Sequence, residues 1–379
     1  MTTRGEPLYK TRPHAPSGAR FGRCERINES ICLSEGNSNV YLVQTEEGNI
    51  LINSGMGFEA PVHQSNFESL LGCQDLDIRF LVYTQGHVDH VGGTAYFRSR
   101  NPGMQVIATA LNEEHQDYDA RLQPFRSARS AFRFVDDFVE LFSYYAEQGY
   151  TDLNPQDRPS ADIHFEDRYT FSLGGVEVEL IAQPGAETND SLVVWLPRQR
   201  VCFTGNLFGC PFGHFPNLVT IRGDRYRDAL TCAQAAQTVL DLDPESILYG
   251  HHGPIIGAAL VKREVTAIRD AILHVHDATV RGMNEGKDVH TLMREISLPA
   301  QCEVGEGYGK VSWSVRAIWE HYAGWFHHES TTELYDVPRS AVDSDLVELA
   351  GADSLVSRDR KSTRLNSSHS QQSRMPSSA

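Results

Sequence analysis

Residues 80–93, Phe-Leu-Val-Tyr-Thr-Gln-Gly-His-Val-Asp-His-Val-Gly-Gly, constrain the fold more than any other stretch of the sequence. The apolar run 80–83 predicts a buried strand, and two glycines close the loop that follows it. That loop carries Gln85, His87, Asp89 and His90. Imidazole and carboxylate groups are ligands that zinc, manganese and iron accept. A polar loop whose histidines only form hydrogen bonds is the alternative, but so many ligands in so few residues favour a metal site at one strand end.

Composition limits what the chain can be. Its 379 residues are 40% hydrophobic and 22% charged, which predicts one large domain with an appendage. A formal net charge of −16 argues against nucleic-acid binding, because phosphate contacts need clustered Lys and Arg. We therefore expect a small-molecule substrate. No apolar stretch approaches the roughly 20 residues of a membrane span, and no signal peptide is recognisable, so a cytoplasmic location is expected. The 7 cysteines are scattered without Cys-x-x-Cys spacing and are expected to be reduced thiols.

Three later segments bring further candidate ligands. Pro-Gly-Ala-Glu-Thr-Asn-Asp-Ser at 184–191 follows a predicted strand and contains Glu187. Val-Cys-Phe-Thr-Gly-Asn-Leu-Phe at 201–208 contains Asn206, and Tyr-Gly-His-His-Gly-Pro at 249–254 contains His251 and His252. A glutamate in a loop is usually only solvated, but Glu187 follows a strand at a position where a ligand is needed.

Together these motifs resemble the metallo-β-lactamase superfamily, with its signature His-x-His-x-Asp-His. The resemblance implies an α/β fold of the metallo-β-lactamase type, an αββα sandwich, here with a helical insertion and a C-terminal helical appendage. The chain departs from the family pattern at four positions. Gln85 stands at the first histidine, Asn53 at the acid of the early Asp-x-Gly, Glu187 at the third histidine, and Asn206 at the acid that bridges two metals.

The residues at these positions resemble the pattern of one branch of the superfamily, the type III alkylsulfatases. Glu187 and Asn206 have the 19-residue spacing of that branch's two glutamates. The segment 217–223, Asn-Leu-Val-Thr-Ile-Arg-Gly, resembles the branch's sulfate-binding segment, which implies that Asn217 and Arg222 bind substrate. Residues 307–326 resemble the start of the alkylsulfatase dimerisation domain, which implies a homodimer.

This resemblance implies a metal-dependent hydrolase that cleaves alkyl sulfate esters to alcohol and sulfate. One metal ion would be held by Asp89, His90 and His252, with His251 as the alternative ligand or a supporting partner. A second would be held by His87, Glu187 and Gln85, with Asn206 between or beside the two ions. Zinc is expected at one or both sites, with manganese or iron as alternatives. A water whose pKa the cation lowers would attack or supply a proton, with Asp89 and Arg222 as catalytic residues.

Two other functions remain open from the sequence. The same site could hydrolyse a lactone, a thioester or a β-lactam. The loss of basic or acidic groups at Gln85, Asn53 and Asn206 also fits a weakly active homologue that binds a ligand.

The expected organisation has four parts. Residues 1–28 form an N-terminal arm, 29–285 the metallo-β-lactamase-like domain with a helical cap at about 115–165, 286–357 the start of a truncated dimerisation region, and 358–379 a non-native, adapter-like tail that we expect to be disordered.

The sequence predicts two helices with an apolar face, and each face has two possible roles. Phe134, Phe138 and Phe142 recur every four residues and form either core or an apolar cap suited to a hydrocarbon tail beside the substrate's anionic head. Five residues share a second face, which either closes the core or meets another subunit: Val311, Val315, Ile318, Tyr322 and Trp325.

Overall fold

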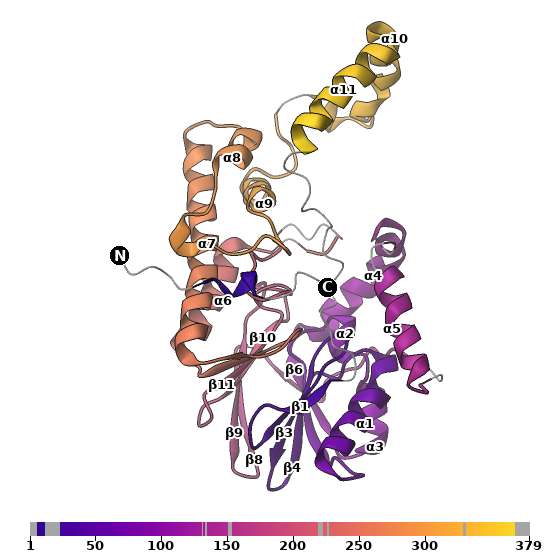
Figure 1. Ribbon diagram of the computed structural model, residues 1–379, viewed down its shortest axis with the longest axis vertical. Coiled ribbons are helices and arrows are strands. Elements are labelled where there is room, and N and C mark those ends of the chain that lie inside the picture. Colours follow the sequence, from indigo (N-terminus) through magenta and orange to yellow (C-terminus); the bar gives the residue numbers. More distant parts are fainter. Residues whose placement is uncertain are drawn as a thin grey trace.

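The computed structural model of the chain describes residues 6–11, 23–130, 132, 135–150, 154–218, 223–225, 227–328 and 331–367. Two β-sheets pack face to face, and helices cover their outer faces (Figure 1). This is the α/β sandwich that the sequence predicted, and the prediction is confirmed.

The first sheet has the order β1-β2-β3-β4-β5-β6-β7. Its strands are β1 (Cys24–Arg26), β2 (Ile31–Ser34), β3 (Val40–Thr45), β4 (Gly48–Ile52), β5 (Ile78–Val82), β6 (Gln105–Thr109) and β7 (Ile163–Phe165). β1 to β4 pair antiparallel, and β4 to β7 pair parallel. The predicted β3–β4 hairpin and the predicted strand before the ligand loop, β5, are both present.

The second sheet has the order β13-β12-β11-β10-β9-β8. Its strands are β8 (Arg168–Leu173), β9 (Val176–Ala182), β10 (Leu192–Leu196), β11 (Val201–Gly205), β12 (Ser246–Tyr249) and β13 (Ile255–Ile256). β11 and β12 run parallel, so the segments that follow them leave the sheet at the same edge. These segments carry Asn206 and the two adjacent histidines.

The helices are α1 (Ala60–Leu71), α2 (Val88–Val91), α3 (Thr94–Arg100), α4 (Asn112–Ser130), α5 (Val135–Glu147), α6 (Ala229–Asp241), α7 (Ala258–Asn284), α8 (Val289–Glu295), α9 (Val311–Ala323), α10 (Asp343–Ala350) and α11 (Ala352–Ser367). The 3₁₀ helices are η1 (Leu8–Lys10), η2 (Gly57–Glu59), η4 (Ala300–Cys302), η5 (Thr331–Leu334) and η6 (Arg339–Val342). No helix within these described ranges is long and apolar enough to cross a membrane.

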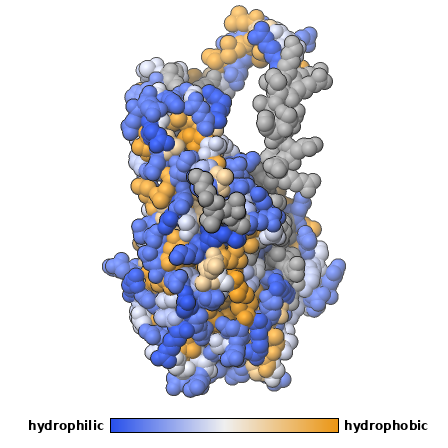
Figure 2. Space-filling model, turned by 60° about the vertical axis from the view of Figure 1, so that its left-hand side comes forward, coloured by the Kyte–Doolittle hydropathy of each residue, from blue (hydrophilic) through white to orange (hydrophobic). Residues whose placement is uncertain are grey.

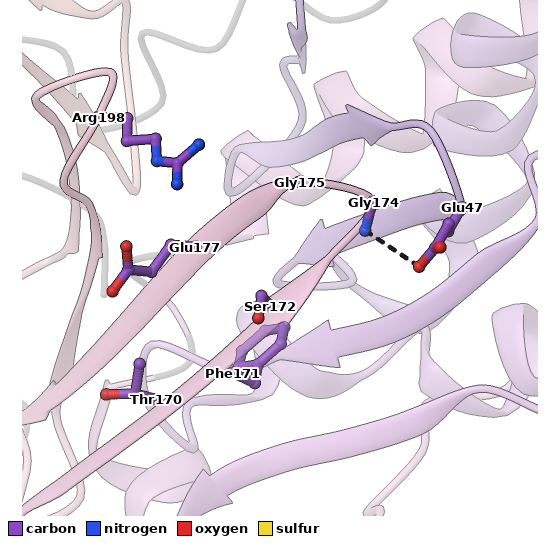
Figure 3. Close-up of a pocket in the computed structure, with 8 residues that line it drawn as sticks. All are labelled: Glu47, Thr170, Phe171, Ser172, Gly174, Gly175, Glu177 and Arg198. Atoms are coloured by element: carbon purple, nitrogen blue, oxygen red, sulfur yellow. Dashed lines mark hydrogen bonds between the residues drawn. The ribbon is translucent and has the colours of Figure 1, made fainter.

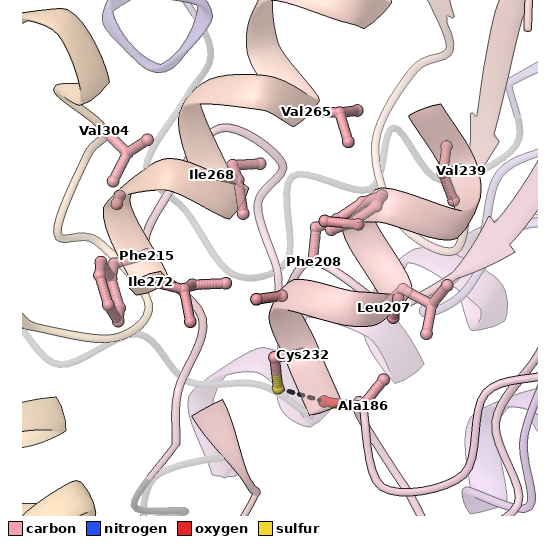
Figure 4. Close-up of a cluster of buried hydrophobic side chains, with 14 of the residues drawn as sticks. Ala186, Leu207, Phe208, Phe215, Cys232, Val239, Val265, Ile268, Ile272 and Val304 are labelled. Carbon is pink, nitrogen blue, oxygen red and sulfur yellow. Dashed lines mark hydrogen bonds between the residues drawn. The ribbon is translucent and has the colours of Figure 1, made fainter. Parts of the chain in front are cut away.

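Three apolar cores hold the layers together. Alternate residues of both sheets meet between them, as Val43 and Val194 illustrate. The first sheet also packs on α1 and α3 through residues such as Phe67 and Phe97. The second sheet packs on α6 and α7, and Figure 4 shows Val265, Ile268 and Ile272 of α7 meeting residues of α6 and of the loop after β11. Because every strand is anchored by its apolar side chains, the loops that follow the strands are held in fixed positions.

The helical insertion packs partly on the domain. Leu141 and Tyr145 of α5 are buried with Val62, whereas Phe142 remains 37% exposed. The predicted aromatic face is therefore only in part core; Phe134 lies outside the described residues. The Tyr145 hydroxyl donates a hydrogen bond of 2.8 Å to Glu59 Oε1. Burial raises the pKa of Glu59 to about 7, although hydrogen bonds from Asn37, Tyr145 and Met56 act to lower it.

The C-terminal helices divide between core and surface. Val311, Val315 and Ile318 of α9 are buried, so this half of the face closes the core. Tyr322 and Trp325 are 51% and 69% exposed, and their contact with another subunit stays a prediction. α10 and α11 project from the body, and hydrophobic residues lie on the projecting part in Figure 2. Of the tail expected to be disordered from residue 358, the described part is helical up to Ser367, and it contains no glycine or proline that would interrupt the helix. The expectation is therefore wrong for residues 358–367, and the rest of the tail lies outside the described residues.

We predict that Tyr145→Phe lowers the free energy of unfolding by about 1–2 kcal/mol, because it removes a buried hydrogen bond to Glu59. Urea denaturation measures the change. The matched control is Tyr335→Phe, the same chemical change at a side chain that is 68% exposed. Equal effects of the two substitutions would contradict the role of the Tyr145 hydroxyl.

Candidate metal centre

A short loop and the four-residue helix α2 present the first group of ligands. β5 ends at Val82, and His87 occupies the N-cap of α2 in an extended conformation (φ −61°, ψ 146°). Asn53 supports this loop from β4, since its Oδ1 accepts hydrogen bonds from Thr84 N at 2.9 Å and Thr84 Oγ1 at 3.1 Å. Asn53 has φ 61°, a left-handed conformation that asparagine tolerates better than most residues. The amide thus keeps the acceptor oxygen of the acid it replaces.

Four side chains meet beyond the ends of β5, β11 and β12. Asp89 Oδ2 lies 3.4 Å from His90 Nε2 and 3.6 Å from His251 Nε2. Asn206 Nδ2 lies 3.1 Å from each of the same two imidazole nitrogens. All four residues are buried. Asp89, His90 and His251 are one of two groups of three potential metal ligands found among the described residues.

Local hydrogen bonds prepare His251 as a ligand. Its Nδ1 lies 2.7 Å from the backbone oxygen of Asn37. A carbonyl can only accept, so Nδ1 carries the proton and Nε2 offers its lone pair toward Asp89. Next to it, Gly250 makes room, because a Cβ atom there would lie 2.1 Å from Asn206 Oδ1.

Burial also sets the charges of the cluster. It lowers the pKa of His90 to about 4, although the charge of Asp89 acts to raise it, so this imidazole is neutral near pH 7. For Asp89, burial acts to raise the pKa, but electrostatic interactions with His90, His251 and His87 outweigh it and the pKa falls. The cluster therefore presents an ionised carboxylate and a neutral imidazole, the states in which both bind metal.

The donor set fits a divalent cation. Asp89 Oδ2 and Asn206 Oδ1 are buried and accept no hydrogen bond from the described residues. Buried polar atoms are usually satisfied, so the unsatisfied Asp89 Oδ2 next to two imidazole nitrogens points to a metal ion as its partner. A carboxylate and two imidazoles suit zinc, manganese or iron.

His252 lies elsewhere. Its backbone is left-handed (φ 62°), and its Nε2 is 3.6 Å from Cys210 Sγ. Of the two adjacent histidines, the structure therefore brings His251, the alternative from the sequence, to Asp89 and His90.

The ligands expected for a second ion do not form one group. Gln85 Nε2 contacts His87 Nδ1 at 2.6 Å, and His87 Nε2 lies 3.3 Å from Asp224 Oδ2. Glu187 instead forms a buried ion pair, with Arg227 Nη2 at 2.6 Å from its Oε1. Burial acts to lower the pKa of Arg227, but the charge of Glu187 outweighs it and the pKa rises. The charge of Glu187 is thus matched by a cation of the chain itself.

Of the two residues expected to bind substrate, the structure describes Asn217 only. Asn217 is half-buried, its backbone oxygen accepts a hydrogen bond from Arg227 Nη1 at 3.1 Å, and its Oδ1 is buried without a hydrogen bond from the described residues. Arg222 lies outside the described residues.

Sequence reasoning missed Arg227, His115 and Asp119. His115 and Asp119 are four residues apart on α4, a spacing that places both on one helix face and could have indicated a paired site. No pattern links Arg227 to Glu187, which is 40 residues away.

A surface pocket lies far from these ligands. Figure 3 shows it between the β8–β9 turn and Glu47, whose Oε2 accepts a hydrogen bond from Gly174 N at 3.3 Å. Glu47 precedes β4 at the edge where β5 begins, whereas the ligand loop follows the end of β5. The pocket is therefore separate from the metal centre.

Comparisons with known proteins agree with this geometry. Residues 33–251, more than half of the chain, match the metallo-β-lactamase superfamily. The chain belongs to the metallo-β-lactamase superfamily. Residues 290–370 of this superfamily member match the alkyl sulfatase dimerisation family, a match that runs past the start of the predicted adapter-like tail.

Two curated relatives of this superfamily member are alkylsulfatases. It is 26% identical over 328 residues to a linear primary-alkylsulfatase of Pseudomonas sp. (strain ATCC 19151), covering 82% of this chain and 60% of the relative. It is 27% identical over 304 residues to an (R)-specific secondary-alkylsulfatase of Pseudomonas sp., covering 74% and 44%. The chain thus spans less than two thirds of the length of these relatives.

A solved structure shares the fold. The stereoselective inverting sec-alkylsulfatase from Pseudomonas sp. superposes with a TM-score of 0.73 at 19% identity, covering 91% of this chain and 57% of that one. The superfamily member is therefore related to alkylsulfatases in fold and sequence.

We predict that His251→Asn weakens metal binding by about 100-fold or more, whereas His252→Asn leaves it nearly unchanged. The asparagine amide at 251 can still donate to the Asn37 carbonyl but lacks the Nε2 ligand, and asparagine tolerates the left-handed backbone at 252. Competition with a zinc indicator measures the affinity. Greater loss in the His252 variant would contradict the assignment.

Proposed function

We propose that this chain is a metal-dependent hydrolase of alkyl sulfate esters, yielding an alcohol and sulfate. The cluster of Asp89, His90, His251 and Asn206 carries the proposal, because its donor set suits a divalent cation in a chain related to alkylsulfatases. A bound cation would supply Lewis acidity, which lowers the pKa of a water molecule and offsets negative charge on the leaving sulfate.

Charge favours an anionic substrate. Asp89 is the one carboxylate in the cluster, and Asn206 adds none where the superfamily pattern has an acid. With a divalent cation and neutral imidazoles, the cluster carries a net charge of about +1. Glu187, which the sequence led us to expect as a ligand, would not reduce this charge, since Arg227 balances it. A sulfate ester is attracted to such a site more strongly than a neutral carbonyl compound.

Other residues would position the substrate. In this proposal Asp89 orients the attacking water, while Asn217 and Arg222 hold the sulfate group. The planar guanidinium of arginine offers paired donors to a tetrahedral oxyanion. On α5, the exposed Val135, Val139 and Phe142 offer an apolar surface for the hydrocarbon tail.

We also propose a homodimer. The match to the dimerisation family and the exposed apolar residues of the C-terminal region support it. These residues include Trp325, Leu346 and Leu349, which are 69%, 54% and 85% exposed. Pairing of two chains through this region would remove that surface from water.

A metal-binding homologue with little turnover is the second candidate. The buried ion pair between Glu187 and Arg227 favours it, because that pair occupies a side chain expected to bind metal. An assay that follows both sulfate and bound metal separates the two candidates.

We predict that the zinc- or manganese-loaded chain releases inorganic sulfate from dodecyl sulfate and that His251→Asn abolishes the release. Ion chromatography measures sulfate, and elemental analysis measures metal. No release from a metal-loaded chain would redirect the proposal to lactones, thioesters or β-lactams. No release together with no bound metal would favour the binding homologue.

We predict that Arg222→Ala lowers the rate of sulfate release by on the order of 100- to 1000-fold while bound metal is unchanged, because it removes donors that stabilise charge on the sulfate. Kinetics and metal content are measured on the same preparation. The matched control is Arg198→Ala, which changes an arginine beside the pocket of Figure 3. Equal loss of metal and activity would contradict a role for Arg222 in substrate binding.

A further inference from the structure

The second group of potential ligands in the described residues combines the signature loop with the helical insertion. His87 of the loop meets His115 and Asp119 of α4, and one ligand atom from each lies within 4.8 Å of the others. His87 and His115 are buried, and their ring centroids are 5.2 Å apart. None of the superfamily segments described above supplies His115 or Asp119.

The hydrogen bonds of His115 fix which nitrogen faces the group. Asn189 Nδ2 donates to Glu114 Oε2 at 2.7 Å, and a carboxylate only accepts, so the orientation of the Asn189 amide is set. Asn189 Oδ1 therefore faces His115 Nδ1 at 2.7 Å and must accept its proton. In the neutral imidazole, His115 Nε2 is then left with a lone pair.

That lone pair is buried and points at the acid. His115 is 1% exposed, and its Nε2 has no hydrogen-bond partner among the described residues. It lies 3.7 Å from Asp119 Oδ2. A bare nitrogen and a carboxylate oxygen repel each other unless a proton or a cation lies between them.

The surrounding charges leave room for a cation. Arg126 Nη1 contacts Asp119 Oδ1 at 2.6 Å, and Arg126 Nη2 lies 3.5 Å from Asp224 Oδ1. Two carboxylates thus share one guanidinium. Arg126 contacts Oδ1 of Asp119, whereas Oδ2 of Asp119 faces His115. Asp224 Oδ2 lies 3.3 Å from His87 Nε2 and adds negative charge next to the group. Gln85 Nε2 lies 2.6 Å from His87 Nδ1, so the Gln85 amide must turn its oxygen toward Nδ1 before His87 Nε2 can offer a lone pair to a cation.

We propose that His87, His115 and Asp119 bind a divalent transition-metal ion. Two imidazole nitrogens and one carboxylate oxygen form a donor set that zinc accepts. The ion would tie α4 to the signature loop. It would also give the chain a second metal with two ligands from the insertion and none from Glu187. The proposal does not depend on the substrate proposed above.

The test is metal stoichiometry of the full chain. Metal is stripped with a chelator, zinc is restored, excess is removed by gel filtration, and bound zinc is measured by elemental analysis. We expect two ions per chain for the natural sequence and one for His115→Asn, whose amide can still donate to Asn189 but lacks Nε2. Asp119→Asn is also expected to retain one. Asp117→Asn is the matched control, because it removes the same charge from α4 at a side chain that is 67% exposed, and it should retain two.

Each outcome decides the proposal. Two ions in the His115 and Asp119 variants would overturn it. A single ion in the natural sequence that is lost in the His251→Asn variant would also overturn it, but that result would leave the proposed hydrolase intact. If His115→Asn does not fold, Asp119→Asn decides, because Asp119 is 16% exposed and tolerates the change more readily. One ion in each of the Asp119 and His251 variants, and none in the double variant, would support two separate sites.

Discussion

The centre depends on keeping one carboxylate ionised where water is scarce. Asp89 is buried, and burial alone would favour its protonated form. The three imidazoles His87, His90 and His251 lower its pKa enough to preserve the charge. They come from one loop and from the end of a strand in the other sheet, so the face-to-face packing of the sheets is what creates the electrostatic environment.

Much of this arrangement could be predicted from the sequence because it is local. The strand, the tight loop and the short helix follow from an apolar run, two glycines and the alternation of ligands, and they bring Asp89 and His90 together. The choice between His251 and His252 could not be predicted. It depends on a left-handed backbone at His252 and on a hydrogen bond from His251 to Asn37, far away in the sequence.

Contacts between distant segments account for the other surprises. Glu187 pairs with Arg227 because the loop after β9 packs beside the start of α6, where Cys232 also contacts the Ala186 backbone oxygen at 3.0 Å (Figure 4). His115 packs closely on the ligand loop at Gly86, where a Cβ atom would lie 3.2 Å from His115 Cδ2. Sequence patterns report the spacing within an element, but such contacts depend on how elements pack.

The amide substitutions change charge more than shape. Asn53 still accepts two hydrogen bonds from Thr84, and Asn206 still lies between His90 and His251. An amide has the shape of the acid and keeps one acceptor oxygen, but its nitrogen donates where a carboxylate would accept, and it contributes no negative charge. A cation bound by Asp89 would therefore keep more of its own charge than one held by several carboxylates. In the proposed hydrolase, the same changes would weaken metal affinity but make a bound cation a stronger Lewis acid and a better partner for an anionic substrate.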